Sequence, residues 1–260
     1  MWGILVTLIL LCSCTGQIEE QGSSRRATKA QQSAPSPSWL TKSYLLGQFD
    51  PPRHPLFDRI PVGLAERPNM YLRREALAAL LEMADAAGRD SVRFLVRSAT
   101  RNFNRQKQIW ESKWRGDRLL EGREQAPKVY PRPYDRAKAI LRWSSMPGSS
   151  RHHWGTDVDF NAFDNAYFEH GSGKRFYSWM LAHASTYGFC QPYTRRDSLR
   201  PVGYNEERWH WSYRPVAAIC LKAYRDSIGY ADFKNFLGYE MADSVRIIDD
   251  YVLGVNRGCY

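Results

Sequence analysis

Long apolar runs are almost absent from this sequence of 260 residues. The one run of note covers residues 2–11, about ten residues, which at a rise of about 1.5 Å each cannot cross a bilayer core of roughly 30 Å. A protein with several membrane spans is therefore excluded. Cysteine is also scarce, since five cysteines in a chain of this length do not make a disulfide-stabilised scaffold.

Acidic side chains are the minority among the charged residues. The chain has 27 Asp and Glu against 37 Lys and Arg, which gives a formal charge of +10. Such a surface favours acidic partners, and nucleic acid, anionic lipid and an anionic cell-wall polymer all fit. No basic helical stripe and no aromatic RNA-binding motif is present, so nucleic acid is not expected as a partner. With 43% hydrophobic and 13% aromatic residues the chain can bury a sizeable core, which excludes wholesale disorder.

The apolar run at the start of the chain is typical of a signal-peptide core. It ends in Leu11-Cys12-Ser13-Cys14, which resembles the lipobox of bacterial lipoproteins. The resemblance implies that residues 1–13 are removed and that Cys14 is lipidated. Lipidation of Cys12, a plain secretory signal and a short anchor are the alternatives. All of them place the folded part in the bacterial cell envelope, facing the periplasm or the outside.

Residues 14–38 are rich in Ser, Gln, Ala and Pro and contain almost no large apolar side chain. Such a segment cannot bury enough surface to fold, so we expect a flexible tether between the lipid and the folded part. From residue 39 the composition becomes globular, with no internal repeat and no second linker. Residues 39–260 are therefore expected to form a single domain.

Hydrophobic periodicity predicts both helices and strands in this domain. Residues 71–87 carry an apolar stripe typical of a helix that Gly88 would end, and residues 92–98 alternate as in a strand. Further helices are expected over residues 104–114, 134–143, 174–187, 216–228 and 240–253, and further strands over residues 156–160 and 207–213. Residues 43–69 are expected to wrap the surface, and residues 115–133 to form a loop. Because helices and strands do not alternate regularly and no glycine-rich phosphate loop appears, we expect the α+β class.

Two short segments concentrate residues that can bind a metal ion. The first, residues 150–159, places two imidazoles and two carboxylates around Gly155. A turn at this glycine can bring one of the histidines beside one of the carboxylates. Imidazole nitrogen together with carboxylate oxygen suits zinc, at about 2.0–2.2 Å. The four candidates are His152, His153, Asp157 and Asp159.

The second segment, residues 207–211, reads Glu-Arg-Trp-His-Trp. On a strand, His210 would point to one face while Trp209 and Trp211 point to the other. Two histidines and one aspartate would supply the three protein ligands of a catalytic zinc site, whose fourth position holds water. Glu207 is then a spare carboxylate close enough to accept the proton of that water.

The two segments together resemble the motifs of a known family. Residues 150–159 match S-x-H-x-x-G-x-x-x-D and residues 207–211 match E-x-x-H-W. These patterns are similar to those of the zinc D-alanyl-D-alanine carboxypeptidases of the vancomycin-resistance type, a family that includes L,D-carboxypeptidases. The resemblance implies zinc bound by His152, Asp159 and His210. It also implies a small antiparallel sheet that carries the zinc site and is flanked by helices.

The same resemblance assigns roles around the metal. Glu207 would be the catalytic base. Ser98-Ala-Thr-Arg101, with Gln106 five residues further on, is similar to the family's S-G-Y-R-S-x-x-x-Q segment. Arg101, Gln106 and Ser150 would therefore hold the terminal region of the substrate, including its carboxylate, which suits the two parallel hydrogen bonds of an arginine. Arg101 would also stabilise negative charge on the attacked carbonyl.

One position departs from the family pattern, because Asp157 stands where the family has alanine. Asp157 and Asp159 share one face of a strand, so either carboxylate could bind the ion. Alternatively, Asp157 accepts a hydrogen bond from a ligand or lies beside a substrate ammonium. His153 is expected on the opposite side from His152, as a structural or a rim residue.

The sequence thus leads to the hypothesis of a zinc-dependent hydrolase that removes the terminal D-Ala of peptidoglycan stem peptides. The hypothesis includes membrane contact through a lipid anchor only and no obligate protein partner. L,D-carboxypeptidase or endopeptidase activity on the same polymer remains an alternative, as does a non-hydrolytic lipoprotein that binds the cell wall. At most one disulfide can form among Cys190, Cys220 and Cys259, and its pairing stays open.

Overall fold

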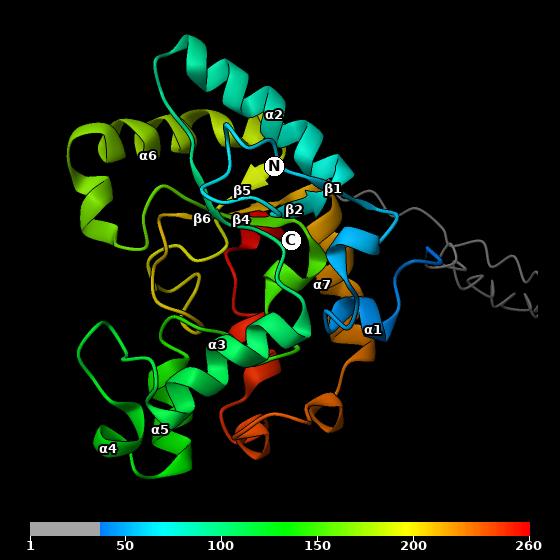
Figure 1. Ribbon diagram of the computed structural model, residues 1–260, viewed down its shortest axis with the longest axis vertical. Helices are drawn as coiled ribbons and strands as arrows, with labels where there is room; N and C mark the ends of the chain where they lie inside the picture. The colour runs from blue at the N-terminus through cyan, green and yellow to red at the C-terminus, as the bar shows by residue number, and fades with distance from the viewer. Residues whose placement is uncertain (1–36) are drawn as a thin grey trace, which may run out of the picture. The chain divides into compact units, whose positions relative to one another are not determined.

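The structure is a computed structural model that describes residues 37–260 (Figure 1). The expected signal segment, Cys14 and most of the expected tether lie outside the described residues. Within residues 37–260, no helix is both long enough and apolar enough to cross a membrane.

A four-stranded antiparallel sheet, with the strand order β3-β4-β6-β5, is the main sheet of the domain. Its strands are β3 Val96–Ser98, β4 Asp157–Phe160, β5 Phe189–Cys190 and β6 His210–Tyr213. A second, two-stranded antiparallel sheet pairs β1 Phe57–Arg59 with β2 Tyr71–Arg73. Short antiparallel strands combined with helices confirm the expected α+β class.

Helices cover the main sheet on both sides. They are α1 Lys42–Leu45, α2 Arg74–Arg89, α3 Phe103–Arg115, α4 Ala126–Val129, α5 Pro133–Ile140, α6 Gly171–His183 and α7 Arg214–Ser227. Figure 1 shows α2 and α6 on one side of the sheet and α3 and α5 on the other. One apolar core joins α2, α6 and the sheet, and a second joins α1, α3, α5, α7 and the C-terminal segment.

The helix expected over residues 71–87 is present but begins and ends later. Residues 71–73 form β2 instead, because they pair in register with β1. Gly88 lies inside the helix, and the backbone of Asp90 makes the C-terminal cap. The buried stripe otherwise follows the helical period, although Leu81 is 41% exposed. Tertiary strand pairing therefore overrode the local helical pattern at the N-terminal end.

The prediction of one continuous helix over residues 240–253 is wrong. The structure has a 3-10 turn over Tyr239–Met241 and a π-helical turn over Ile247–Val252. Between them Arg246 adopts a φ of 54°, in the left-handed region, which a continuous α-helix does not allow. The apolar side chains of this stretch are nevertheless buried, so the hydrophobic pattern indicated burial rather than conformation.

Other expected elements differ at their boundaries. The proline-rich residues 43–69 do more than wrap the surface, because Tyr44, Leu45 and Ile60 are buried. The strand expected over residues 207–213 begins only at His210, since the backbone N–H of His210 donates to the carbonyl of Glu207 in a turn. Residues 115–133 contain the short helix α4.

A disulfide links Cys190 on β5 to Cys259 near the C-terminus. Cys220 on α7 keeps a free thiol and is fully buried among apolar side chains. The pairing that the sequence left open therefore ties the C-terminal segment to an edge of the main sheet.

Gly155 joins the turn carrying His152 to β4 and has a φ of 72°. A Cβ atom at this position would lie 2.2 Å from Cε1 of Phe57 and 3.2 Å from the backbone nitrogen of Arg73. The carbonyl of Gly155 also accepts a hydrogen bond of 3.0 Å from that nitrogen. Glycine at residue 155 thus allows the two-stranded sheet to pack directly against the segment that carries the histidines.

We expect Gly155→Ala to lower the free energy of unfolding by about 2–4 kcal/mol, because left-handed strain and overpacking add. Urea unfolding measures the change. Gly63→Ala is the matched control, because a Cβ there meets no atom within 4 Å and its φ is not positive. Equal stability of the two variants would contradict the packing argument.

Candidate active site

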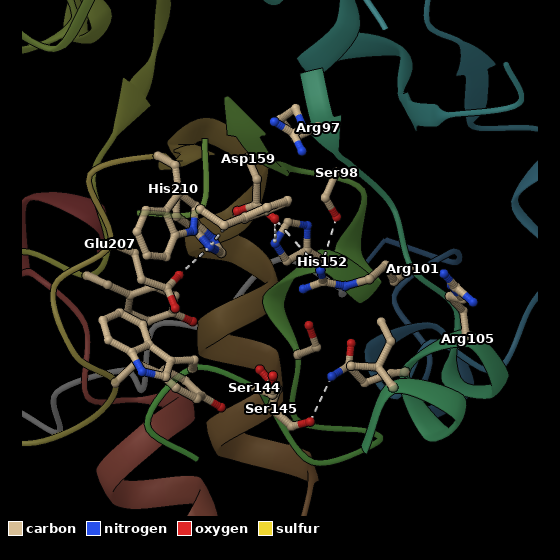
Figure 2. Close-up of a pocket in the computed structure, with 18 of the residues that line it drawn as sticks. Arg97, Ser98, Arg101, Arg105, Ser144, Ser145, His152, Asp159, Glu207 and His210 are labelled. Atoms are coloured by element: carbon tan, nitrogen blue, oxygen red, sulfur yellow. Dashed lines mark hydrogen bonds and ion pairs between the residues drawn. The ribbon is translucent and has the colours of Figure 1, made fainter. Parts of the chain in front are cut away.

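A pocket of ≈ 460 Å³ opens where the turn after α5, one face of α3 and the strands β3, β4 and β6 converge. Figure 2 shows side chains from these elements pointing into it. The residues to which the family resemblance assigns roles all line this pocket: His152, Asp159, His210, Glu207, Arg101, Gln106 and Ser150. The other two candidates, His153 and Asp157, do not. The folded chain thus gathers segments that are up to about a hundred residues apart.

His152, Asp159 and His210 form a compact buried group. One ligand atom of each lies within 4.8 Å of the others. Nε2 of His152 is 3.2 Å from Oδ2 of Asp159, and Nδ1 of His210 is 3.2 Å from Oδ1 of Asp159. His152 comes from the 3-10 turn Arg151–Trp154, whereas Asp159 and His210 are register partners on β4 and β6.

Two atoms of this group support metal binding. Nε2 of His152 and Oδ1 of Asp159 are buried without a hydrogen-bond partner. Leaving such atoms unpaired costs free energy, which coordination to a cation would offset. Two imidazole nitrogens and one carboxylate oxygen make a donor set that fits a divalent metal ion. His152, Asp159 and His210 are therefore the residues that could hold it.

The second nitrogen of each ring is already engaged. Nδ1 of His152 lies 2.8 Å from the carbonyl oxygen of Ala99, and Nε2 of His210 lies 2.8 Å from Oδ2 of Asp157. With protons held on these nitrogens, Nε2 of His152 and Nδ1 of His210 remain for an ion. The two rings therefore present different nitrogens to the same point.

Close packing of these buried charged groups shifts their pKa values in the ion-free structure. Burial, followed by the charge of Arg101, lowers the pKa of His152, so its ring is neutral as a ligand must be. Burial alone would lower the pKa of His210, but hydrogen bonds to Asp157, Asp159 and Glu207 raise it well above its usual value. Burial of Asp159 opposes ionisation, yet the two histidines hold its pKa well below the usual range.

Asp157 does not belong to the metal-binding group but lies against the far nitrogen of His210. It is fully buried and also accepts hydrogen bonds from Nε of Arg151 at 3.1 Å, Oγ of Ser212 at 2.7 Å and Oγ1 of Thr156 at 2.7 Å. The sequence left open whether Asp157 binds the ion, accepts a hydrogen bond from a metal ligand or lies beside a substrate ammonium. The geometry favours the second role, with His210 as the hydrogen-bond donor. Asp157 thereby fixes the orientation of His210.

Glu207 is 5% exposed, and its Oε2 lies 3.1 Å from Nδ1 of His210. Burial raises the pKa of Glu207, against the opposing effect of the His210 hydrogen bond. A carboxylate with a raised pKa is a stronger base than an ordinary glutamate. Its position next to the metal-binding group lets it exchange a proton with a molecule bound there.

Arg101 points toward the same end of the pocket. Its Nη1 donates to Oγ of Ser98 at 3.0 Å and lies 3.7 Å from Oδ2 of Asp159, while its buried Nε has no partner. The side chain is thus partly free to donate to a negative oxygen formed near Asp159.

Gln106 and Ser150 lie further along the pocket. Nε2 of Gln106 donates to the carbonyl of Ser145 at 2.7 Å, and its Oε1 is buried without a partner. The hydroxyl of Ser150 is also buried and unpaired. These two polar atoms are available to a ligand.

His153 faces away from the metal-binding group. Its Nδ1 lies 2.6 Å from the carbonyl oxygen of Arg101, and its Nε2 accepts the backbone N–H of Gly148 at 3.0 Å. This confirms the expected structural role. Of the tryptophans considered for the cleft, Trp209 lines the pocket, whereas Trp154 and Trp211 belong to the apolar cores.

Several residues of the pocket were missed by sequence reasoning, among them Tyr193, Tyr204 and Lys113. The ring of Tyr193 packs edge-on against His210 with 4.7 Å between centroids. Both tyrosines come from an irregular segment without periodicity, so no pattern marked them. Lys113 lies two helical turns after Gln106, and that spacing on an expected helix was a usable signal.

Comparison with known proteins identifies the family. A family model for VanY, described as D-alanyl-D-alanine carboxypeptidase, matches residues 69–216.

The chain belongs to the VanY D-alanyl-D-alanine carboxypeptidase family. This confirms the resemblance that the two motifs suggested. The chain is similar to a D-alanyl-D-alanine carboxypeptidase of Enterococcus faecalis, 29% identical over 156 residues, which cover 60% of this chain and 53% of that protein. It is also similar to the putative carboxypeptidase YodJ of Bacillus subtilis, 27% identical over 151 residues, covering 55% of this chain and 46% of the relative.

Among solved structures, one similar chain is VanYB in complex with D-Alanine-D-Alanine, with 24% identity and a TM-score of 0.46. That match covers 68% of this VanY-family chain and 87% of the solved one. The match to the two curated VanY-type relatives spans only about half of their length.

We expect Asp157→Asn to weaken zinc binding by about 10- to 100-fold, because His210 loses the carboxylate that orients its ring. Loss of the buried negative charge also leaves Arg151 unpaired, which should lower the free energy of unfolding by about 3–5 kcal/mol. Competition with a chromophoric chelator measures the affinity, at a temperature where the variant is still folded.

Asp117→Asn is the control for loss of one carboxylate, because Asp117 is exposed and pairs only with Arg115. It should leave zinc affinity unchanged. If folded Asp157→Asn bound zinc as tightly as the control variant, Asp157 would have no role in orienting His210.

Proposed function

We propose that this protein is an extracytoplasmic zinc carboxypeptidase that removes the terminal D-Ala from peptidoglycan stem peptides. The observation that carries the proposal is the buried group of His152, Asp159 and His210 with Glu207 beside it. Membership in the VanY family supports the reaction class, since relatives in this family carry the name D-alanyl-D-alanine carboxypeptidase.

In the proposed mechanism His152, Asp159 and His210 would hold the zinc ion. A zinc ion bound there would act as a Lewis acid and lower the pKa of a coordinated water toward neutrality. Glu207 accepts the proton of the attacking water and passes it to the nitrogen of the departing D-Ala. Burial next to His210 suits both steps, because it raises the pKa of Glu207. A carboxyl group with a raised pKa accepts a proton, and gives it up again, more evenly near neutral pH.

Arg101 stabilises the negative charge that develops on the carbonyl oxygen during attack. The unpaired Nε–H and the 3.7 Å distance from Nη1 to Asp159 place its guanidinium at the metal end of the pocket. Gln106 and Ser150 contribute an acceptor and a hydroxyl to the terminal region of the substrate.

The location forms part of the proposal. The apolar start of the chain and Cys14 support export and lipid anchoring, with the enzyme domain as the peptidoglycan-facing part and no further protein partner required. Metabolic labelling with a fatty acid tests it: the label should enter the wild-type chain and be absent from Cys14→Ala. Labelling of the variant to the same extent would contradict Cys14 as the lipidated residue.

The same site would also suit cleavage of an L,D bond or of an internal peptide bond of the polymer. Digestion of purified muropeptides, followed by mass spectrometry, identifies the bond that is cut. Loss of D-Ala from pentapeptides, and its abolition by a chelator, is the expected result. Binding without cleavage would instead indicate a cell-wall-binding protein.

We expect Glu207→Gln to lower kcat by about 100- to 10,000-fold, because the amide cannot accept the proton. Zinc content should stay close to wild type, since Glu207 is not among the three proposed ligands. Release of D-Ala from a pentapeptide, measured beside the zinc content, checks both statements.

Glu206→Gln is the matched control, because the neighbouring Glu206 pairs with Arg208 and does not line the pocket. It should retain wild-type activity. Comparable activity of the Glu207 and Glu206 variants would remove Glu207 from the mechanism.

A further inference from the structure

Strand pairing fixes two of the metal-binding residues but does not extend to Glu207. β6 begins at His210, whose register partner on β4 is Asp159. Glu207 lies three residues before His210, in the turn closed by the hydrogen bond from the N–H of His210 to the carbonyl of Glu207. Figure 2 shows Glu207 pointing toward His210 in the pocket. A catalytic group has to be placed to within about 0.5 Å, so contacts outside the sheet must fix this turn.

A buried side-chain amide, that of Gln191, binds the carbonyl of Glu207. Its Nε2 donates to that carbonyl at 3.1 Å and to the carbonyl of Tyr193 at 3.3 Å. The N–H of Glu207 in turn donates to the carbonyl of Tyr193 at 2.9 Å. The hydroxyl of Tyr177 donates to Oε1 of Gln191 at 2.9 Å, so both ends of the amide have partners. Gln191 is only 5% exposed, which leaves little room for water to replace these bonds.

A second amide, that of Asn165, binds the residues on either side of Glu207. Its Nδ2 donates to the carbonyl of Glu206 at 2.8 Å, and its Oδ1 accepts the N–H of Arg208 at 3.1 Å. A backbone carbonyl can only accept and a backbone N–H can only donate, so these two contacts define which end of the amide is the oxygen. Both contacts are to the backbone, and the side chains of Glu206 and Arg208 take no part in them.

Neither amide lines the pocket. Asn165 begins the 3-10 turn Asn165–Glu169 that follows β4, whereas Gln191 comes directly after β5. The two amides therefore reach the turn from different parts of the fold and bind neighbouring peptide groups of it. Because they do not touch the space where a substrate would bind, any effect on the reaction has to pass through the residues that they hold.

We propose that Gln191 and Asn165 are positioning residues that set the carboxylate of Glu207 beside the metal-binding group. The inference rests on the proposed carboxypeptidase function, in which Glu207 transfers the proton. The metal-binding group does not depend on the two amides, because strand pairing and other hydrogen bonds hold its three residues. Loss of either amide should therefore slow the reaction without releasing the metal.

Gln191→Leu is the main test, because leucine has a similar volume but makes no hydrogen bond. Both carbonyls that lose the amide keep a second hydrogen bond, so the variant should remain folded. We expect kcat for release of D-Ala from a pentapeptide to fall by about 10- to 100-fold, the effect of a misplaced catalytic group. KM and zinc affinity should stay within about twofold of the wild type, since neither substrate nor metal contacts Gln191.

Two further variants grade the effect. Asn165→Leu removes the second amide and should lower kcat in the same direction. Tyr177→Phe keeps Gln191 but removes the hydroxyl that binds its Oε1. It should lower kcat by about fivefold, the usual effect of one neutral hydrogen bond.

Gln125→Leu is the matched control, because Nε2 of Gln125 also donates to a backbone carbonyl, that of Gly116 at 3.4 Å, and Gln125 does not line the pocket. It should keep the wild-type kcat. Circular dichroism and thermal melting establish that all variants are folded at the temperature of the assay.

A double-mutant cycle separates positioning from general damage to the pocket. In the Glu207→Gln background no base is left to position, so Gln191→Leu should lower the residual kcat no further. A variant that damaged the pocket in general would lower kcat by the same factor in both backgrounds.

Hydrogen–deuterium exchange gives a readout that does not depend on turnover. The N–H of Glu207 is bonded to neither amide, so its exchange reports whether the turn itself has loosened. Exchange at Glu207 should become faster in both Gln191→Leu and Asn165→Leu, while exchange along β6 stays unchanged. If the wild type cleaved no stem peptide but exchange followed this pattern, the proposed function would fail and the role of the amides in fixing the turn would stand.

Three results would overturn the inference. The first is a folded Gln191→Leu variant with the kcat of the wild type. The second is an equal loss of kcat in the wild-type and Glu207→Gln backgrounds. The third is a zinc affinity that falls together with kcat, because the amide would then act on His210 through Tyr193, whose ring packs against it.

Discussion

The pairing of β4 with β6 is the constraint on which the rest of the site depends. Their antiparallel register sets Asp159 opposite His210 and Asp157 opposite Ser212. Because alternate residues of a strand share a face, these four polar side chains lie on one face of the pair. Val158 and Trp211, on the other face, pack into the apolar core with α2 and α6. One short pairing therefore both anchors the sheet and presents the polar group to the pocket.

Burying this polar face would be costly without compensation. Asp157 and Asp159 are 0% and 3% exposed, and an isolated buried carboxylate is strongly unfavourable. Arg151, itself buried, offsets the charge of Asp157 and stacks its guanidinium 4.8 Å from the ring centre of Trp154. Asp159 has no buried arginine hydrogen-bonded to it: the two histidine rings approach it at 3.2 Å and Arg101 at 3.7 Å, and its Oδ1 accepts no hydrogen bond of good geometry. Asp157, which orients His210, therefore has hydrogen-bond partners for its charge. Asp159, which would bind an ion, keeps one oxygen without a hydrogen bond.

The sequence predicted the part of the site that depends on short-range spacing. Residues 150–159 and 207–211 each hold their polar groups within one turn or strand, so the local pattern identified the two segments of the site. The choice of His152, Asp159 and His210 among their polar residues came from the family resemblance. The α+β class also followed from the irregular order of elements. Element ends were less predictable, since residues 71–73 became a strand only through pairing with a distant partner. Tyr193 and Tyr204 escaped notice for the same reason, because tertiary packing of an irregular segment sets Tyr193 against His210 and Tyr204 against Tyr193.

The net charge of +10 acquires a more specific meaning from the structure. Within the pocket, Asp159 and Glu207 lie at one end, while Lys113, with Arg118 nearby, marks the other. A bound zinc ion would cancel much of the negative charge at the first end. The two ends would then differ in the chemical groups they offer to a ligand rather than in the sign of their charge. One end would hold a Lewis acid with a base, and the other a cation. The polarity of the pocket would therefore orient the substrate before any contact with its side chains.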